Sequence, residues 1–150
     1  MDRNISSERS FSFRDEFPDQ WYTLNNPEQT SEPMSVTWQT RRIDFPPNME
    51  RLKIGQVVLY FSITEDMSWN GIEVELKFSE AEQSDPVGGI ASPVDGVVST
   101  RRASAGEWAS ILGKSIEGEW QLSVPELKQM FLDEKVKDIL FVITYEGQSF

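Results

Sequence analysis

Two stretches of the chain show the clearest patterns of apolar and polar positions. In residues 72–78, apolar side chains alternate with charged ones, which predicts a β-strand with one buried and one solvated face. Residues 54–64 instead form the longest apolar run of the chain, rich in β-branched side chains, which predicts a central strand buried on both faces. Asn70 and Gly71 precede the alternating stretch and are typical of a tight turn.

Weaker patterns predict the other elements. Further strands are expected at residues 10–14, 34–41, 97–100, 108–112, 119–124 and 138–145. Pro18 favours a short helical turn over residues 18–24, and Pro125 begins a longer helix at residues 126–135. Residues 79–96 are small, acidic and rich in Gly and Pro, so they are expected to form a long loop.

These elements together define the expected fold class. About eight strands with one short helix near the C-terminus predict an all-β protein, an antiparallel β-sandwich that is jelly-roll-like. Trp38 and Trp120 fall on strand faces and are expected in its core. The polar residues 1–10 are expected to be a flexible lead-in, and residues 11–150 are expected to form a single β-sandwich domain.

The sequence also carries no sign of a membrane segment. No apolar run approaches the ~20 residues that span a bilayer. The polar N-terminus lacks the apolar core of a signal peptide. We therefore expect a protein that is made in soluble form and does not insert into a membrane by this chain alone.

Composition and charge then restrict the chemistry and the partners. With no cysteine and no histidine, the chain has no thiolate metal site, disulfide, cysteine nucleophile or Ser-His-Asp triad, and no enzymatic activity is expected. The 25 acidic and 14 basic residues give a formal charge of −11. Such a surface repels nucleic acids and anionic membranes and attracts a cationic partner.

The acidic side chains are themselves candidates for chemistry. They cluster beside predicted turns at Asp15, Glu16 and Asp19, at Glu65 and Asp66, at Glu80, Glu82 and Asp85, and at Glu117 and Glu119. A glycosidase needs two carboxylates facing each other across a cleft, and this spacing selects no such pair, so a carboxylate glycosidase is a remote alternative. Residues 80–95 offer oxygen ligands for Ca²⁺ but lack the order of a dedicated calcium loop. No cofactor is expected, with Ca²⁺ as the open alternative.

Two groups of aromatic and amide side chains suit carbohydrate binding. A sugar site stacks an aromatic ring on the sugar face and surrounds it with hydrogen-bonding groups. Trp21, Tyr22 and Asn25 form one candidate site, and Trp69 with Asn70 forms another at a predicted turn. The favoured alternative for the first group is a latch, in which the aromatic side chains of residues 13–22 pin the start of the chain to the core.

One basic stretch stands out in the acidic chain. Residues 99–108 contain Arg101 and Arg102, several small residues and Trp108. Arginine and tryptophan often anchor protein interfaces, so these three residues are candidates for protein binding. In the alternative interpretation, the two arginines pair with acidic neighbours on the surface.

Five motifs, taken in order, resemble a known family. They are FSFRDEFPDQWY at residues 11–22, DFPPN at 44–48, VVLYF at 57–61, GEWQL at 118–122 and KDILFVITY at 137–145. Together they resemble the C-terminal β-sandwich region of the A subunits of bacterial Tc insecticidal toxin complexes. In that family the A subunit forms a bell-shaped pentamer with a translocation channel, and its C-terminal portion docks the B–C cocoon that holds the toxic enzyme.

The resemblance implies a non-catalytic assembly module, released as part of a complex, whose partners are toxin-complex components. An A subunit is far longer than 150 residues, so pentamer formation and cocoon docking are not carried over, and neither is any individual contact residue. The expected function is therefore protein docking. Carbohydrate recognition, with a glycan as the partner, is the alternative.

Overall fold

The computed structural model describes residues 4–26, 35–64, 68–69, 71–80, 85–100 and 103–149. Within this part, the strands are β1 (Asn4–Ser12), β2 (Ser35–Thr40), β3 (Met49–Ile63), β4 (Val74–Glu80), β5 (Val87–Ala91), β6 (Val97–Ser99), β7 (Gly118–Ser123) and β8 (Val136–Ser149). The helical segments are α1 (Phe13–Glu16), α2 (Pro18–Asn25), η2 (Arg42–Asp44), η3 (Ala103–Ile111), η4 (Pro125–Leu127) and α3 (Lys128–Leu132).

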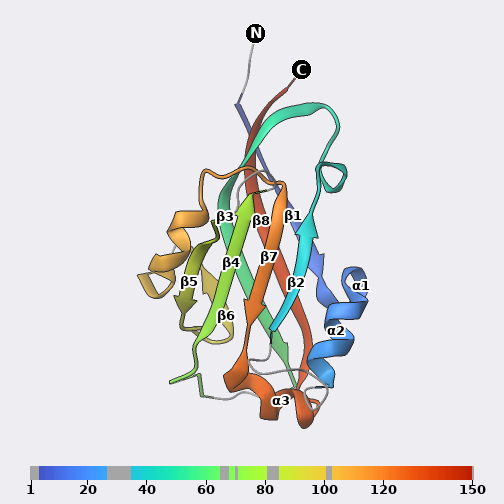
Figure 1. Ribbon diagram of the computed structural model, residues 1–150, viewed down its shortest axis with the longest axis vertical. Coiled ribbons are helices and arrows are strands. Elements are labelled where there is room, and N and C mark those ends of the chain that lie inside the picture. The colour runs from blue at the N-terminus through green and yellow to red at the C-terminus, as the bar shows by residue number, and fades with distance from the viewer. Residues whose placement is uncertain are drawn as a thin grey trace.

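The strands form two four-stranded sheets packed face to face, in the orders β1-β8-β3-β6 and β2-β7-β4-β5 (Figure 1). The pairs β1–β8, β2–β7, β3–β6 and β4–β5 are all antiparallel, so the first half of the chain pairs with the second half in reverse order. This nested pairing is that of a long hairpin wound into two layers, the jelly-roll arrangement. The predicted antiparallel β-sandwich is confirmed.

Aromatic side chains join the two layers. Trp38 on β2 and Trp120 on β7 lie opposite each other, with their rings stacked 6.3 Å apart. Phe141, from β8 in the other sheet, packs edge-on against both rings, at 5.2 Å and 4.8 Å between centroids. The indole Nε1 of Trp120 donates a hydrogen bond to Thr40 Oγ1 (2.9 Å), which satisfies its polar group in the core. Both tryptophans are buried, as predicted.

The sheet of long strands extends beyond its partner. β3 has 15 residues and β8 has 14, whereas β2 and β7 have six each. The connection from β2 to β3 arches over this extension (Figure 1). There Phe45, only 4% exposed, packs edge-on against Tyr145 at 5.1 Å between ring centroids, so this connection belongs to the core.

Helices α1 and α2, which follow β1, close one open side of the sandwich, beside β2 in Figure 1. Phe13 is fully buried and packs edge-on against Trp38 at 4.8 Å. Phe17 stacks on Phe11 at 5.5 Å, and Trp21 meets Phe131 edge-on at 6.0 Å. These contacts are those expected of the predicted latch.

Tyr22 is the member of this segment that does not fit the latch. Its side chain is 63% exposed, so the prediction that it packs on the core is wrong. Trp21 and Tyr22 are consecutive residues of α2, and successive helical side chains point about 100° apart. Only one of the two can therefore face the core.

This difference gives a test of the latch. Trp21→Ala is expected to lower the free energy of unfolding by about 1–3 kcal/mol, because it removes apolar area packed on Phe131. Tyr22→Ala, the matched exposed aromatic, is expected to change it by less than about 0.5 kcal/mol. Urea denaturation measures both values, monitored by far-UV circular dichroism because tryptophan fluorescence would itself change in Trp21→Ala. Equal effects of the two substitutions would contradict the latch.

The η3 segment closes the opposite side, beside β5 (Figure 1). Three of its side chains form hydrogen bonds with the backbone of β5. Ser110 Oγ accepts from Gly88 N (2.9 Å), and Glu107 Oε2 accepts from Ile90 N (3.3 Å). Trp108 Nε1 donates to Gly89 O (2.9 Å). Because these groups occupy the edge, another strand cannot pair with it.

Several sequence-based predictions of elements are corrected here. Residues 108–112 were expected to be a strand, but Trp108 and Ile111, three residues apart, lie on one side of the 3₁₀ turn η3. The expected loop at residues 79–96 contains β5, which β4 and η3 stabilise from both sides. Pro125 does begin a helical segment, but α3 already ends at Leu132.

The start of the chain also differs from expectation. Residues 4–10 form a strand rather than an irregular lead-in, paired residue by residue with β8 from Asn4 opposite Gln148 to Ser12 opposite Leu140. Backbone pairing needs no apolar side chains, so the polar composition of this segment did not reveal it. The Ser12 side chain then accepts from Asp15 N (3.3 Å) and begins α1, which ends the strand earlier than predicted. The division of the chain into domains stays a prediction.

Candidate protein interface

The structure separates the residues of the first predicted carbohydrate site. Trp21 is half-buried against Phe131, and Tyr22 is exposed on a different face of α2. Asn25 Nδ2 donates to the carbonyl oxygen of Trp21 (2.9 Å), so this amide is engaged at the end of its own helix. The three side chains therefore do not form one sugar platform, and glycan binding by them stays a prediction.

The second predicted carbohydrate site loses its aromatic platform. Trp69 is only 8% exposed, and its ring packs on Phe61 with the centroids 5.7 Å apart. Sugar stacking requires an exposed ring, so the prediction that Trp69 is exposed is wrong. Asn70 lies outside the described residues.

The predicted basic contact patch also loses its aromatic member. Trp108 is fully buried beneath β5, so the expectation that its ring is offered to a protein partner is wrong. Arg101 and Arg102 lie outside the described residues, and their role in protein binding stays a prediction.

Acidic residues that are distant in sequence come together at one hollow. Glu80, Glu117 and Glu119 line an open cavity of about 400 Å³ at the ends of β2, β4 and β7. Glu80 accepts a hydrogen bond from Ser115 N (2.9 Å) and lies 3.8 Å from Lys114 Nζ, so it holds the neighbouring turn in place. Among the residues that the structure describes, no group of acids has the arrangement of a metal site. Ca²⁺ binding by residues 80–95 stays a prediction, since residues 81–84 are not described.

The outer face of the β1-β8-β3-β6 sheet carries an apolar row that crosses several strands. Tyr60 on β3 lies opposite Val97 on β6 and opposite Leu140 on β8. Val94 forms an isolated bridge with Val97 and extends the row. Directly opposed residues of antiparallel strands point to the same face, so these four side chains lie side by side.

A second, shorter row lies next to the first. Val58 on β3 is opposite Val142 on β8, and each is two residues from a member of the first row. Tyr60 and Val94 are each 41% exposed, and Val58, Val97, Leu140 and Val142 are half-buried. A contiguous apolar patch on a sheet face that water reaches is typical of a surface that another molecule covers.

This patch revises one sequence-based prediction. The run at residues 54–64 was expected to be buried on both faces, but its fully buried side chains are those of one face: Ile54, Val57, Leu59 and Phe61. Val58 and Tyr60 on the other face remain accessible. The continuous apolar pattern was the signal of this patch, because a strand with one solvated face has no need of apolar residues on it.

The described helices include none that is long and apolar enough to cross a bilayer. No known protein family matches the chain, and no curated protein matches it either.

Solved structures do share its fold. The cryo-EM structure of Yersinia pseudotuberculosis TcaA-TcaB matches 98% of this chain with a TM-score of 0.59 and 14% identity, over 10% of that chain. The cryo-EM structure of Morganella morganii TcdA4 matches 97% of this chain with a TM-score of 0.60 and 15% identity, over 7% of that chain. The 150 residues thus span a tenth or less of these proteins. At this identity the likeness concerns the fold, and the resemblance to Tc toxin subunits is confirmed at that level.

Proposed function

We propose that this chain is a non-catalytic docking module that binds a partner protein through the outer face of the β1-β8-β3-β6 sheet. The observation that carries the proposal is the apolar row of Val94, Val97, Tyr60 and Leu140 on an accessible face. Covering this row would bury apolar surface at roughly 25 cal/mol per Å². Tyrosine, the largest side chain of the row, is enriched at interface centres.

Charge and the fold comparison support a protein partner for this face. The exposed acids Glu8 and Glu146 follow the same outward face of β1 and β8, in a chain with a formal charge of −11. A second copy would bring the same negative charge, so self-association through this face is disfavoured. We infer a protein partner with an apolar centre and a basic rim. In the solved structures with this fold, the matching part is a small fraction of a long chain, which suits a module packed against other components of a Tc-like complex.

The proposal is tested by Tyr60→Glu. A charge in the centre of the patch is expected to abolish co-elution, in size-exclusion chromatography, with the Tc-type components encoded in the same genome, because the buried carboxylate would have no partner. Gln121→Glu, an exposed position on the outer face of the other sheet, adds the same charge and is expected to leave co-elution unchanged.

Circular dichroism of both variants checks the fold, which neither exposed position should alter. Loss of co-elution by both variants, or by neither, would remove this face from consideration. A wild-type chain that binds none of those components would instead overturn the proposed class of partner.

A further inference from the structure

A polar groove runs along β2, between α1 and α2 on one side and the turn that contains η2 on the other. It has a volume of about 580 Å³, and the side chains that matter here are Glu16, Gln20, Gln39, Arg41, Ile43 and Glu119. The hollow of about 400 Å³ described above shares Gln39, Arg41 and Glu119 with the groove and extends it past Ser79. The combined site lies on another surface than the apolar rows.

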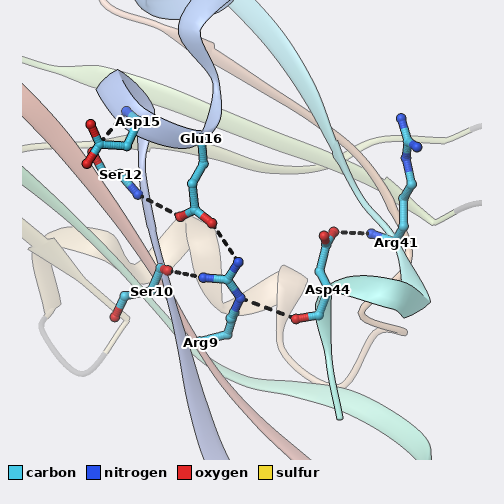
Figure 2. A network of polar contacts seen from close by, with 7 residues as sticks. All are labelled: Arg9, Ser10, Ser12, Asp15, Glu16, Arg41 and Asp44. Carbon is cyan, nitrogen blue, oxygen red and sulfur yellow. Dashed lines mark hydrogen bonds and ion pairs between the residues drawn. The ribbon is translucent and has the colours of Figure 1, made fainter. Parts of the chain in front are cut away.

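One arginine ties the two walls of the groove together (Figure 2). Arg9 Nη2 forms an ion pair with Glu16 Oε1 in α1 (2.6 Å), and Arg9 Nε donates to the carbonyl oxygen of Asp44 in η2 (3.2 Å). The same guanidinium lies 4.2 Å from the centroid of the Phe11 ring. A planar guanidinium with fixed donors sets the separation of α1 and η2 more rigidly than a single-point contact would. The groove is therefore formed before any ligand arrives.

The η2 wall is held from inside as well. Asp44 Oδ2 accepts from Arg41 N (2.8 Å), and Arg42 donates to the carbonyl oxygens of Phe45 (3.2 Å) and Met49. On this braced turn Ile43 is 86% exposed. Single exposed apolar residues are common on protein surfaces, but this one is fixed on a rigid turn at the lip of a groove.

The groove also holds polar groups without partners. Among the described residues, the Gln39 amide, the Arg41 guanidinium and the Glu119 carboxylate form no hydrogen bond or ion pair with another side chain or backbone group. Figure 2 shows the Arg41 side chain directed away from the Asp44 carboxylate. Gln39 and Glu119 are opposed residues of β2 and β7, so an amide and a carboxylate stand side by side.

We propose that this groove binds an extended peptide segment of a partner protein. The Gln39 amide has one donor group and one acceptor, as a peptide backbone has. Arg41 pairs with a carboxylate of the segment, Glu119 with a basic side chain, and Ile43 packs against an aliphatic one. A peptide suits the site better than a sugar, because the lip is aliphatic and offers no flat exposed aromatic ring. The inference does not depend on the proposed role of the apolar rows.

The test uses the chain alone with random linear peptides displayed on phage. Selected peptides are expected to carry an acidic residue next to an aliphatic one, and a synthetic copy is used for fluorescence anisotropy. Ile43→Asp and Arg41→Glu are each expected to weaken its binding at least about tenfold, as at interface anchors. Arg9→Lys keeps the charge but loses the fork between Glu16 and Asp44. It is expected to weaken binding less, through a looser groove.

A control variant on the other sheet separates this site from the docking face. Tyr60→Glu is expected to leave peptide affinity unchanged, and retained circular dichroism shows that every variant is folded. Failure to enrich any peptide, or unchanged affinity of Ile43→Asp, would overturn the proposal. A glycan found on an array would overturn the proposal in favour of a sugar site if no peptide competed with its binding and the Glu119→Gln variant no longer bound it.

Discussion

Replacing Phe141 with alanine is expected to lower the free energy of unfolding by about 3–5 kcal/mol, the usual range for a buried phenylalanine. The side chain is fully buried, and its ring contacts Trp38, Trp120 and Phe11, at 5.2, 4.8 and 5.9 Å between centroids. Because it belongs to one sheet and both tryptophans to the other, its loss leaves a cavity between the layers. Since domains are stabilised by only about 5–15 kcal/mol, a large part of the stability would be lost.

The neighbouring residue provides the control. Leu140 lies on the same strand but points to the outer face, where it is half-buried beside Tyr60. Leu140→Ala is expected to cost less than about 1 kcal/mol, since solvent fills the space that the side chain leaves. Under the proposed function it should nevertheless weaken partner binding. Chemical denaturation of both variants measures the difference, and equal losses would show that the outer face is already covered within this chain.

The parts of the fold that follow from side-chain pattern were predictable. β4 and β7 alternate apolar and polar positions, and both strands lie within one or two residues of their predicted bounds. Residues 4–9 of β1 were missed because they are mostly polar and carry no apolar signal, and their stability comes from pairing with β8. β5 was missed because Gly88 and Gly89 read as a loop, although both bond to η3.

The candidate surfaces were predictable to different degrees. The apolar run through Val58 and Tyr60 predicted a strand covered on both faces, whereas the structure leaves its outer face accessible. Under the proposed function, a partner protein covers that face. The groove gave no signal, because Arg9, Glu16 and Asp44 are brought together by the tertiary fold. Two tryptophans that were predicted to be exposed at binding sites are instead buried. Trp69 and Trp108 lie in polar stretches, and each is nevertheless buried, Trp69 against Phe61 and Trp108 beside β5.

The second large effect is expected at Trp108. Trp108→Ala should lower the free energy of unfolding by about 3–5 kcal/mol, because a fully buried indole is removed. It should also expose the edge of β5, since Trp108 anchors η3 through its hydrogen bond to the Gly89 carbonyl oxygen (2.9 Å). An uncovered edge strand pairs with other chains, so the variant is expected to aggregate at concentrations where the wild type does not.

Trp108→Phe separates packing from edge protection. Phenylalanine keeps most of the buried apolar area but has no N–H, so it leaves the Gly89 carbonyl oxygen without its donor while Ser110 and Glu107 still bond the edge. We expect a smaller loss, about 1–3 kcal/mol, the cost of an unsatisfied buried acceptor, with little aggregation. Light scattering during a thermal ramp, beside denaturation curves, measures both quantities. If Trp108→Ala lost stability but stayed monomeric, η3 would be a packing element and the edge of β5 would be protected by something else.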